Sequence, residues 1–189
     1  PFSSSKTISH IRFTARMERF HPDRGMIMPS RFIQILERQN LISYVDLFVF
    51  EECCRLLENW KSLGYREQIL SFNFSRMTLL NADIVSSVSS IAKKYDVEPG
   101  MLEVEVTESA YTNRPERLIT TIEQLMRSGF TVLMDDFGSG YSSLNMLKDI
   151  SIDILKLDMH FLDKENQKSR DILESVVHMA KWLNLRVIA

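Results

Sequence analysis

The sequence lacks the features that mark several classes of protein. It has only two cysteines in 189 residues, and these are neighbours, Cys53 and Cys54. Adjacent cysteines rarely form a disulfide, and no cysteine or histidine spacing matches a zinc site. We therefore expect two reduced thiols in a helix of a cytoplasmic protein.

Long hydrophobic runs and an excess of one charge are also absent. No stretch approaches the roughly 20 apolar residues that cross a bilayer, and no signal peptide is recognisable. The formal net charge is −2, so we expect no general attraction to a nucleic-acid polymer or to an anionic membrane. An anionic ligand would need a local site built from a few residues.

The chain alternates short apolar strands with amphipathic helices. The predicted strands are Ile8–Ala15, Gln68–Phe74, Met101–Thr107, Phe130–Asp135, Ile152–Leu157 and Leu185–Ala189. The predicted helices are a first one around residues 29–36, then Ile42–Leu63, Ala82–Tyr95, Arg114–Ser128 and Ser169–Leu183. Repeated strand–helix units indicate parallel strands with right-handed crossovers. An open doubly wound sheet and a closed barrel both fit this pattern, although no G-x-G-x-x-G motif supports a dinucleotide fold.

The number of predicted strands bears on the barrel alternative. A (β/α)8 barrel usually needs about 250 residues and eight strands, whereas six strands are predicted here. If the fold is a barrel, we expect residues 1–189 to form a single domain that is incomplete at its C-terminal end, with the final strands and helices missing. The last residues, Arg186–Ala189, stop within a strand-like run.

Polar residues stand at the ends of four successive predicted strands. In chain order they are Asn73, Glu105, the pair Asp135–Asp136, and Lys156 with Asp158. The carboxyl ends of parallel strands form the active face of such folds, so these groups should converge. Clustered carboxylates repel one another unless cations neutralise them, and all-oxygen ligands suit Mg²⁺, Mn²⁺ or Ca²⁺ rather than zinc. Helix caps and surface charges are the alternative interpretation, which explains one such residue more readily than four in succession.

This arrangement of residues also has a chemical use. An aspartate that bridges two divalent ions serves phosphodiester hydrolysis, and a lysine can neutralise phosphate charge. After Asp136, the loop Gly138-Ser139-Gly140 lets the backbone approach a ligand closely, although such a loop is often only a turn.

The sequences around these residues closely resemble the EAL domain family. The central match is DDFGSGYSSL at residues 135–144, followed by LK at 147–148 and LKLD at 155–158. Further matches are FNFS at 72–75, EVTES at 105–109, and AKWL and VIA near the end. The resemblance covers essentially the whole chain.

The resemblance implies a TIM-type (β/α)8 barrel that hydrolyses cyclic di-GMP to linear pGpG with two divalent cations, Mg²⁺ or Mn²⁺. Position by position, it implies metal ligation by Asn73, Glu105, Asp135 and Asp136, and catalysis by Asp136 and Lys156. It further implies ligand binding by Arg19 and Asp158, and anchoring of the loop by Glu108 with Gly138, Ser139 and Gly140.

Two departures from the family pattern bear on activity. The Glu-Ala-Leu signature should lie four residues before Arg19, where the sequence reads Ala15-Arg16-Met17. Ala15 offers no carboxylate, and loss of even a residue that supports a metal ligand typically costs about 10–100-fold in affinity or activity. The chain also stops before the position where the family has a further catalytic glutamate.

Three functions remain open, so whether this chain is an enzyme is undecided. The first is a catalytically impaired phosphodiesterase that binds cyclic di-GMP or regulates other domains, and the second is an active metal-dependent phosphodiesterase. The third is a protein-interaction module that binds no nucleotide. Family habit implies a homodimer formed through residues 142–149, other domains in the parent protein, and a cytoplasmic position, which could be within a larger sensor protein.

Overall fold

The computed structural model describes residues 11–15, 19–21, 25–107, 110, 115–138, 147–158 and 167–188, and the side chains of 19–21, 30, 115, 168 and 169 lie outside the description. Within these ranges one parallel sheet dominates. Its strands are β1 (Ile11–Thr14), β4 (Gln68–Asn73), β5 (Leu102–Thr107), β6 (Thr131–Phe137), β7 (Ile154–Leu157) and β8 (Arg186–Ile188). A separate antiparallel hairpin joins β2 (Arg19–His21) to β3 (Gly25–Ile27).

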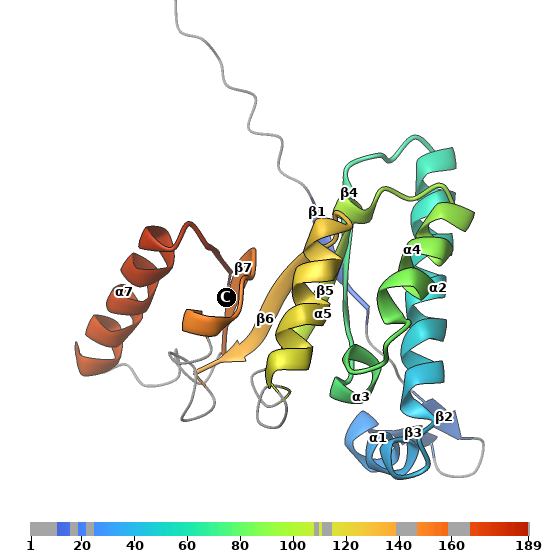
Figure 1. Cartoon of the computed structure of the whole chain (residues 1–189), viewed down its shortest axis with the longest axis horizontal. Helices are drawn as coiled ribbons and strands as arrows, with labels where there is room; N and C mark the ends of the chain where they lie inside the picture. The colour runs from blue at the N-terminus through green and yellow to red at the C-terminus, as the bar shows by residue number, and fades with distance from the viewer. Residues whose placement is uncertain are drawn as a thin grey trace, which may run out of the picture.

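The order of the strands decides between the two architectures that the sequence left open. In the sheet, the strands lie in chain order, β1-β4-β5-β6-β7-β8, and every described pair is parallel. A doubly wound sheet reverses its order at a switch point, and this sheet does not. It curls in one sense with helices outside it, as an incomplete (β/α) barrel does (Figure 1).

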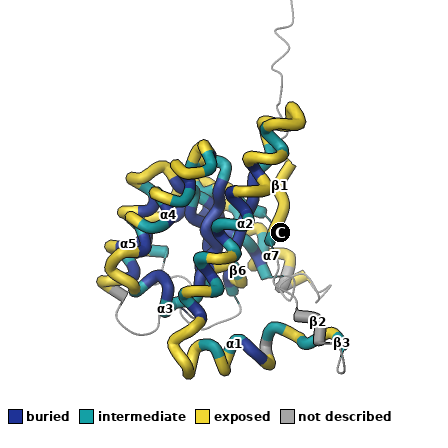
Figure 2. Tube along the Cα trace, turned by 90° about the vertical axis from the view of Figure 1, so that its right-hand side faces the viewer, coloured by how far each residue is buried: buried dark blue, intermediate teal, exposed yellow. Residues whose placement is uncertain are grey.

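Helices cover the outer face of the sheet. They are α2 (Ile42–Ser62), the short α3 (Arg76–Leu79), α4 (Ile84–Lys94), α5 (Pro115–Arg127) and α7 (Gln167–Trp182), with a 3₁₀ turn at Pro99–Met101. Helix α1 (Pro29–Arg38) lies instead beyond one end of the sheet, beside the β2–β3 hairpin (Figures 1 and 2). The buried core lies between α2, α4, α5 and the strands (Figure 2). Phe50 of α2 is fully buried there, with its ring 5.1 Å from that of Phe72 in β4.

Residue alternation along the strands separates this core from the inner face of the sheet. Phe72, Val104 and Met134 belong to the apolar core beneath the helices. Their neighbours in sequence therefore point to the opposite, inner face. Glu103 and Glu105 are on that face, and each is only 1% exposed. The sheet thus holds buried carboxylates on one side and hydrocarbon on the other.

The predicted elements agree with the structure to within a few residues at each end, apart from the first strand, whose Ile8–His10 lie outside the described residues. The β2–β3 hairpin and α3 were missed, because elements of three or four residues are too short to show periodicity. Cys53 and Cys54 are free, buried thiols in α2, as expected. Among the described helices, none combines the length and the apolar character needed to span a bilayer.

Candidate functional site at the carboxyl end of the sheet

Three of the four predicted strand ends are joined through one lysine. The Nζ atom of Lys156 (β7) lies 3.2 Å from Oε2 of Glu105 (β5) and 3.1 Å from Oδ1 of Asp135 (β6). The amide of Asn73 (β4) donates to Oε2 of Glu105 at 3.2 Å. We call these four residues the polar cluster. Their convergence confirms that the polar strand ends meet on one face.

Burial sets the electrostatics of the polar cluster. Burial raises the pKa of Glu105; the hydroxyl of Ser71 and the charge of Lys156 lower it, and the neighbouring Asp135 raises it again. For Lys156, burial alone would lower the pKa, but Glu105 and Asp135 outweigh burial and hold the pKa above its usual value. The lysine is therefore charged at neutral pH, and its charge compensates the two carboxylates around it.

A β-bulge places the Asp135–Asp136 pair. Met134 pairs with Leu155 and Phe137 with Leu157, so β6 has one residue more than β7 between these two pairs. Asp136 takes a φ of 57°, a conformation that aspartate tolerates better than most residues. Both Met134 and Phe137 stay in the apolar core, and the two aspartates between them stay out of it. Oδ1 of Asp135 also accepts the backbone N–H of Asp136 at 2.9 Å.

The polar cluster offers oxygen atoms that could bind a divalent cation. Two carboxylates and an amide oxygen suit Mg²⁺ or Mn²⁺. Across the described ranges, however, no three carboxylate, imidazole or thiolate groups come together as a metal site. Within the polar cluster, Asn73, Glu105 and Asp135 would supply the oxygen ligands of such a cation.

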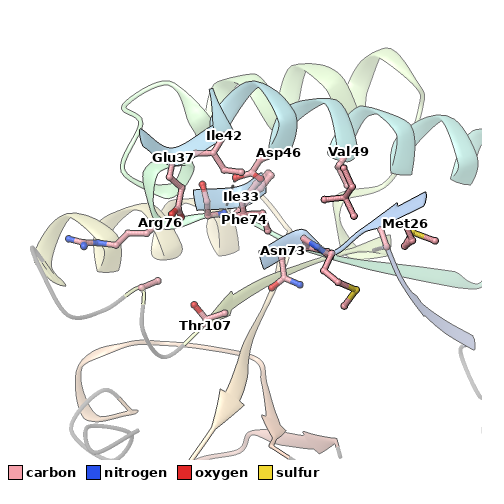
Figure 3. A pocket seen from close by; sticks show the side chains of 16 residues that line it. Met26, Ile33, Glu37, Ile42, Asp46, Val49, Asn73, Phe74, Arg76 and Thr107 are labelled. Atoms are coloured by element: carbon pink, nitrogen blue, oxygen red, sulfur yellow. Dashed lines mark hydrogen bonds between the residues drawn. The ribbon is translucent and has the colours of Figure 1, made fainter. Parts of the chain in front are cut away.

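A cavity of about 680 Å³ adjoins the polar cluster. Asn73 and Thr107 line it from the ends of β4 and β5, and Ile42, Asp46 and Val49 line it from α2 (Figure 3). The β3 strand and α1 form much of the remaining wall, which is mainly apolar. This volume lies within the usual range of pockets for small organic ligands.

Asp46 fixes the wall of this cavity where β4 leads into α3. It is only 7% exposed, and its Oδ2 accepts the backbone N–H of Ser75 at 2.8 Å and the hydroxyl of Thr78 at 2.5 Å. Ser75 in turn caps α3 by accepting the N–H of Thr78. These contacts hold the chain two residues beyond Asn73. This role of Asp46 could not be predicted from the sequence, because an acidic residue in an amphipathic helix usually faces solvent.

A second ion pair lies on the inner face, away from the strand ends. Nε of Arg12 (β1) lies 3.0 Å from Oε1 of the buried Glu103 (β5). Because side chains alternate along a strand, Glu103 and Glu105 share the inner face of β5. The contribution of Arg12 was not anticipated. This pair neutralises the buried Glu103 independently of Lys156.

The other predicted site residues are described to different extents. Asp136 and Asp158 follow Asp135 and Lys156 along the chain; the side chain of Asp136 is exposed and that of Asp158 half-buried. Gly138 has a φ of 95°, a conformation that favours glycine. Arg19 is described only as backbone in β2. Glu108, Ser139 and Gly140 lie outside the described residues, as does most of the 142–149 segment predicted to mediate dimerisation.

The fold and the polar cluster together define the class of protein. A parallel barrel-type sheet with acidic, amide and lysine groups at its strand ends is the arrangement of a barrel domain with its ligand site at the carboxyl face. The family model of the EAL domain matches residues 1–189. The chain belongs to the EAL domain family.

Relatives with a named activity are similar to this sequence over most of its length. It is 33% identical over 171 residues to the bifunctional diguanylate cyclase/cyclic di-GMP phosphodiesterase MucR of Pseudomonas aeruginosa, covering 89% of the chain and 25% of MucR. It is 32% identical over 170 residues to the cyclic di-GMP phosphodiesterase PdeR of Escherichia coli, covering 89% of the chain and 26% of PdeR. The chain thus spans about a quarter of the length of these relatives.

Solved structures agree with the fold. The MucR phosphodiesterase in complex with cyclic di-GMP matches with a TM-score of 0.83 at 31% identity, over 92% of this chain and 71% of that one. The EAL domain of FimX from Pseudomonas aeruginosa, bound to cyclic di-GMP, matches with a TM-score of 0.86 over 96% of this chain and 73% of that one. At 17% identity, FimX supports the fold alone.

Proposed function

We propose that this chain is a cyclic di-GMP-binding domain of the EAL family in which phosphodiesterase activity is impaired. The observation that carries the proposal is the joining of a ligand-sized cavity to the polar cluster through Asn73. The MucR relative supports the choice of nucleotide, because it was solved with cyclic di-GMP bound. The proposed impairment is supported by β1, which ends at Thr14 and is followed by Ala15, because neither residue supplies a carboxylate.

In the proposed binding mode, the charged groups of the polar cluster bind the phosphates and the apolar wall of the cavity binds a base. Asn73, Glu105 and Asp135 would hold one Mg²⁺ or Mn²⁺, which when bound screens the phosphate charge and polarises a phosphorus–oxygen bond. Lys156 carries a positive charge beside these ligands and attracts a phosphate oxygen. The apolar wall of the cavity receives a flat base and excludes water from it. Arg19, Asp136 and Asp158 complete the proposed ligand contacts, and Asp136 and Lys156 are the proposed catalytic pair.

An active phosphodiesterase is the second candidate. It is favoured by the intact set of Asn73, Glu105, Asp135 and Lys156, which the structure brings into direct contact. Both candidate functions include binding of cyclic di-GMP, and they differ in whether the bound nucleotide is hydrolysed efficiently. A homodimer, further domains in the parent protein and a cytoplasmic position stay proposals that accompany both.

The binding proposal is tested with a matched pair of substitutions on β5. Glu105→Gln removes a carboxylate of the polar cluster, whereas Glu103→Gln removes one equally buried that pairs with Arg12 instead. In the intact protein with Ca²⁺, Glu105→Gln should weaken binding of fluorescent cyclic di-GMP by about tenfold or more. Glu103→Gln should leave the dissociation constant within about twofold of the parent. Equal effects of the two substitutions, or no binding by the parent, would contradict the proposed site.

A further inference from the structure

The cavity lies between two parts of the chain that pack differently. On one side, Phe74 at the end of β4 belongs to the apolar core, and Val49 of α2 packs against it. On the other side are β3 and α1, residues 25–38, which we call the β3–α1 unit. Of the residues that the structure describes in this unit, none belongs to the apolar core or packs against it. The core therefore stops at the cavity, and the β3–α1 unit stands beyond it.

Helix α1 borders the cavity with its apolar face. Pro29, Ile33 and Glu37 line the cavity, and their spacing of four residues places them on one side of the helix. Among the described side chains of α1, only Phe32 is buried. A surface helix normally packs its apolar stripe against a core, whereas part of this stripe faces a cavity of about 680 Å³. The space that a ligand would fill thus separates α1 from the core.

Two methionines line the cavity and are nevertheless largely exposed. Met26 and Met28 are 56% and 61% exposed, and they lie two residues apart on extended backbone. Figure 3 shows Met26 at the cavity together with Val49 of α2. Methionine side chains are flexible and polarisable, and they make favourable contacts with aromatic rings. These two side chains become buried only when the cavity is filled or when its walls come together.

A short link joins the β3–α1 unit to α2. Helix α1 ends at Arg38 and α2 begins at Ile42. Between them, Asn40 takes a φ of 56°, and the N–H of Leu41 donates to the carbonyl of Leu36 at 2.8 Å. This hydrogen bond ends α1 within its own last turn. Residues 39–41 are therefore a place where a small change of backbone angles moves α1 as one body.

We propose that the β3–α1 unit closes over the base of a nucleotide bound in the cavity, and that Met26 and Met28 cover this base. The inference deepens the proposed function, since it concerns the same cavity, and rests on it. The polar cluster attracts the phosphates from the side of the sheet, and closure removes water from the opposite side of the nucleotide. Because closure follows binding, the two methionines govern how slowly the nucleotide dissociates more than how fast it associates.

Hydrogen exchange of the intact protein, with and without cyclic di-GMP in the presence of Ca²⁺, tests the closure. Nucleotide binding should slow exchange of the α1 amides by about tenfold or more, because closure suppresses opening of this helix. The amides of α4 are the control, since none of its described residues lines the cavity; their exchange should change by less than about twofold. Exchange in α1 that saturating nucleotide leaves unchanged overturns the inference alone. Absence of nucleotide binding overturns the proposed function and this inference with it.

Substitutions on the same unit test the two methionines. Met26→Ala and Met28→Ala should each raise the dissociation rate constant of fluorescent cyclic di-GMP by about fivefold or more, because each removes apolar area that closure buries. Association should stay within about twofold of the parent. Met28→Leu conserves apolar volume and should dissociate as slowly as the parent. Ile35→Ala is the matched control, because Ile35 is similarly exposed on α1 and is not among the described residues that line the cavity. Dissociation from both methionine variants that is no faster than from Ile35→Ala overturns the proposal.

Discussion

The ammonium group of Lys156 lies between the carboxylates of Glu105 and Asp135, within 3.2 Å of one and 3.1 Å of the other. This relationship holds three strands together at their carboxyl ends. Since Glu105 is almost fully buried, its charge depends on the lysine for compensation. These three groups therefore stabilise one another, and substitution at different pH values measures how much each depends on the others.

Lys156→Met should destabilise the protein by about 1–3 kcal/mol at pH 8, because it leaves a buried carboxylate without its counter-charge. The loss should be smaller at pH 5. Lowering the pH protonates Glu105, whose pKa lies above its usual value, and an uncharged carboxyl needs no lysine. In the parent, the pKa of Lys156 is also raised, so the lysine stays charged at both pH values and loses its charge only in strong alkali.

Urea unfolding of parent and variant at the two pH values measures this difference. Lys148→Met provides the control, since Lys148 is exposed and outside the polar cluster. A destabilisation by Lys156→Met that does not change between pH 8 and pH 5 would show that Glu105 does not depend on the lysine charge.

The positive φ of Asp136 predicts how substitutions in the bulge change the stability of the protein. Asp136→Gly removes the steric cost of a side chain at φ 57°, whereas Asp136→Ala keeps that cost and loses the aspartate. The alanine variant should be less stable than the glycine variant by about 1 kcal/mol. Both should lose any phosphodiesterase activity alike. Thermal unfolding measures the difference in stability between the two variants, and an alanine variant at least as stable as the glycine variant would contradict this prediction.

Asp46 anchors the wall of the cavity, and its removal should loosen that wall. Asp46→Ala leaves the N–H of Ser75 and the hydroxyl of Thr78 without their acceptor, which should cost about 2–3 kcal/mol of stability. Asp46→Asn, which keeps one oxygen acceptor, should cost less. Asp83→Ala is the control, because Asp83 precedes α4 and makes no side-chain cap there; it should change stability by less than about 0.5 kcal/mol. Chemical denaturation of the three variants gives the comparison, and equal losses at positions 46 and 83 would refute the anchor.

The two cysteines should be inert in the folded protein. Burial raises the pKa of Cys53 to about 11 and that of Cys54 to about 12. Since the thiolate is the reactive form, almost none is present at pH 8. A thiol reagent such as dithionitrobenzoate should therefore label no cysteine at pH 8 in the native protein and both after unfolding. Rapid labelling under native conditions would place α2 differently from the structure.

Much of this fold was predictable because its signals are local. Apolar runs bounded by glycine and proline gave the main strands and helices, and polar residues at their ends gave Asn73, Glu105, Asp135 and Lys156. Alternation along 102–107 also places Glu103 and Glu105 on one face, whereas their burial is known only from the structure. These features depend on neighbours in sequence, which is why one sequence suffices to find them.

The remainder depends on contacts between distant segments. Asp46 meets Ser75 and Thr78 only after α2 packs beside the end of β4. The bulge at Asp135–Asp136 becomes visible when the β6–β7 register is known, because alternation alone would place these two aspartates on opposite faces.

Binding without turnover is the central claim, and calorimetry of cyclic di-GMP with the intact protein tests it most directly. The titration is made with Mg²⁺, repeated with Ca²⁺, and the cell contents are analysed for linear pGpG after several hours. The account predicts saturable binding that depends on the cation, with intact cyclic di-GMP recovered. Accumulation of pGpG in the presence of Mg²⁺ would contradict the impairment, and absence of binding with either cation would contradict the nucleotide site itself.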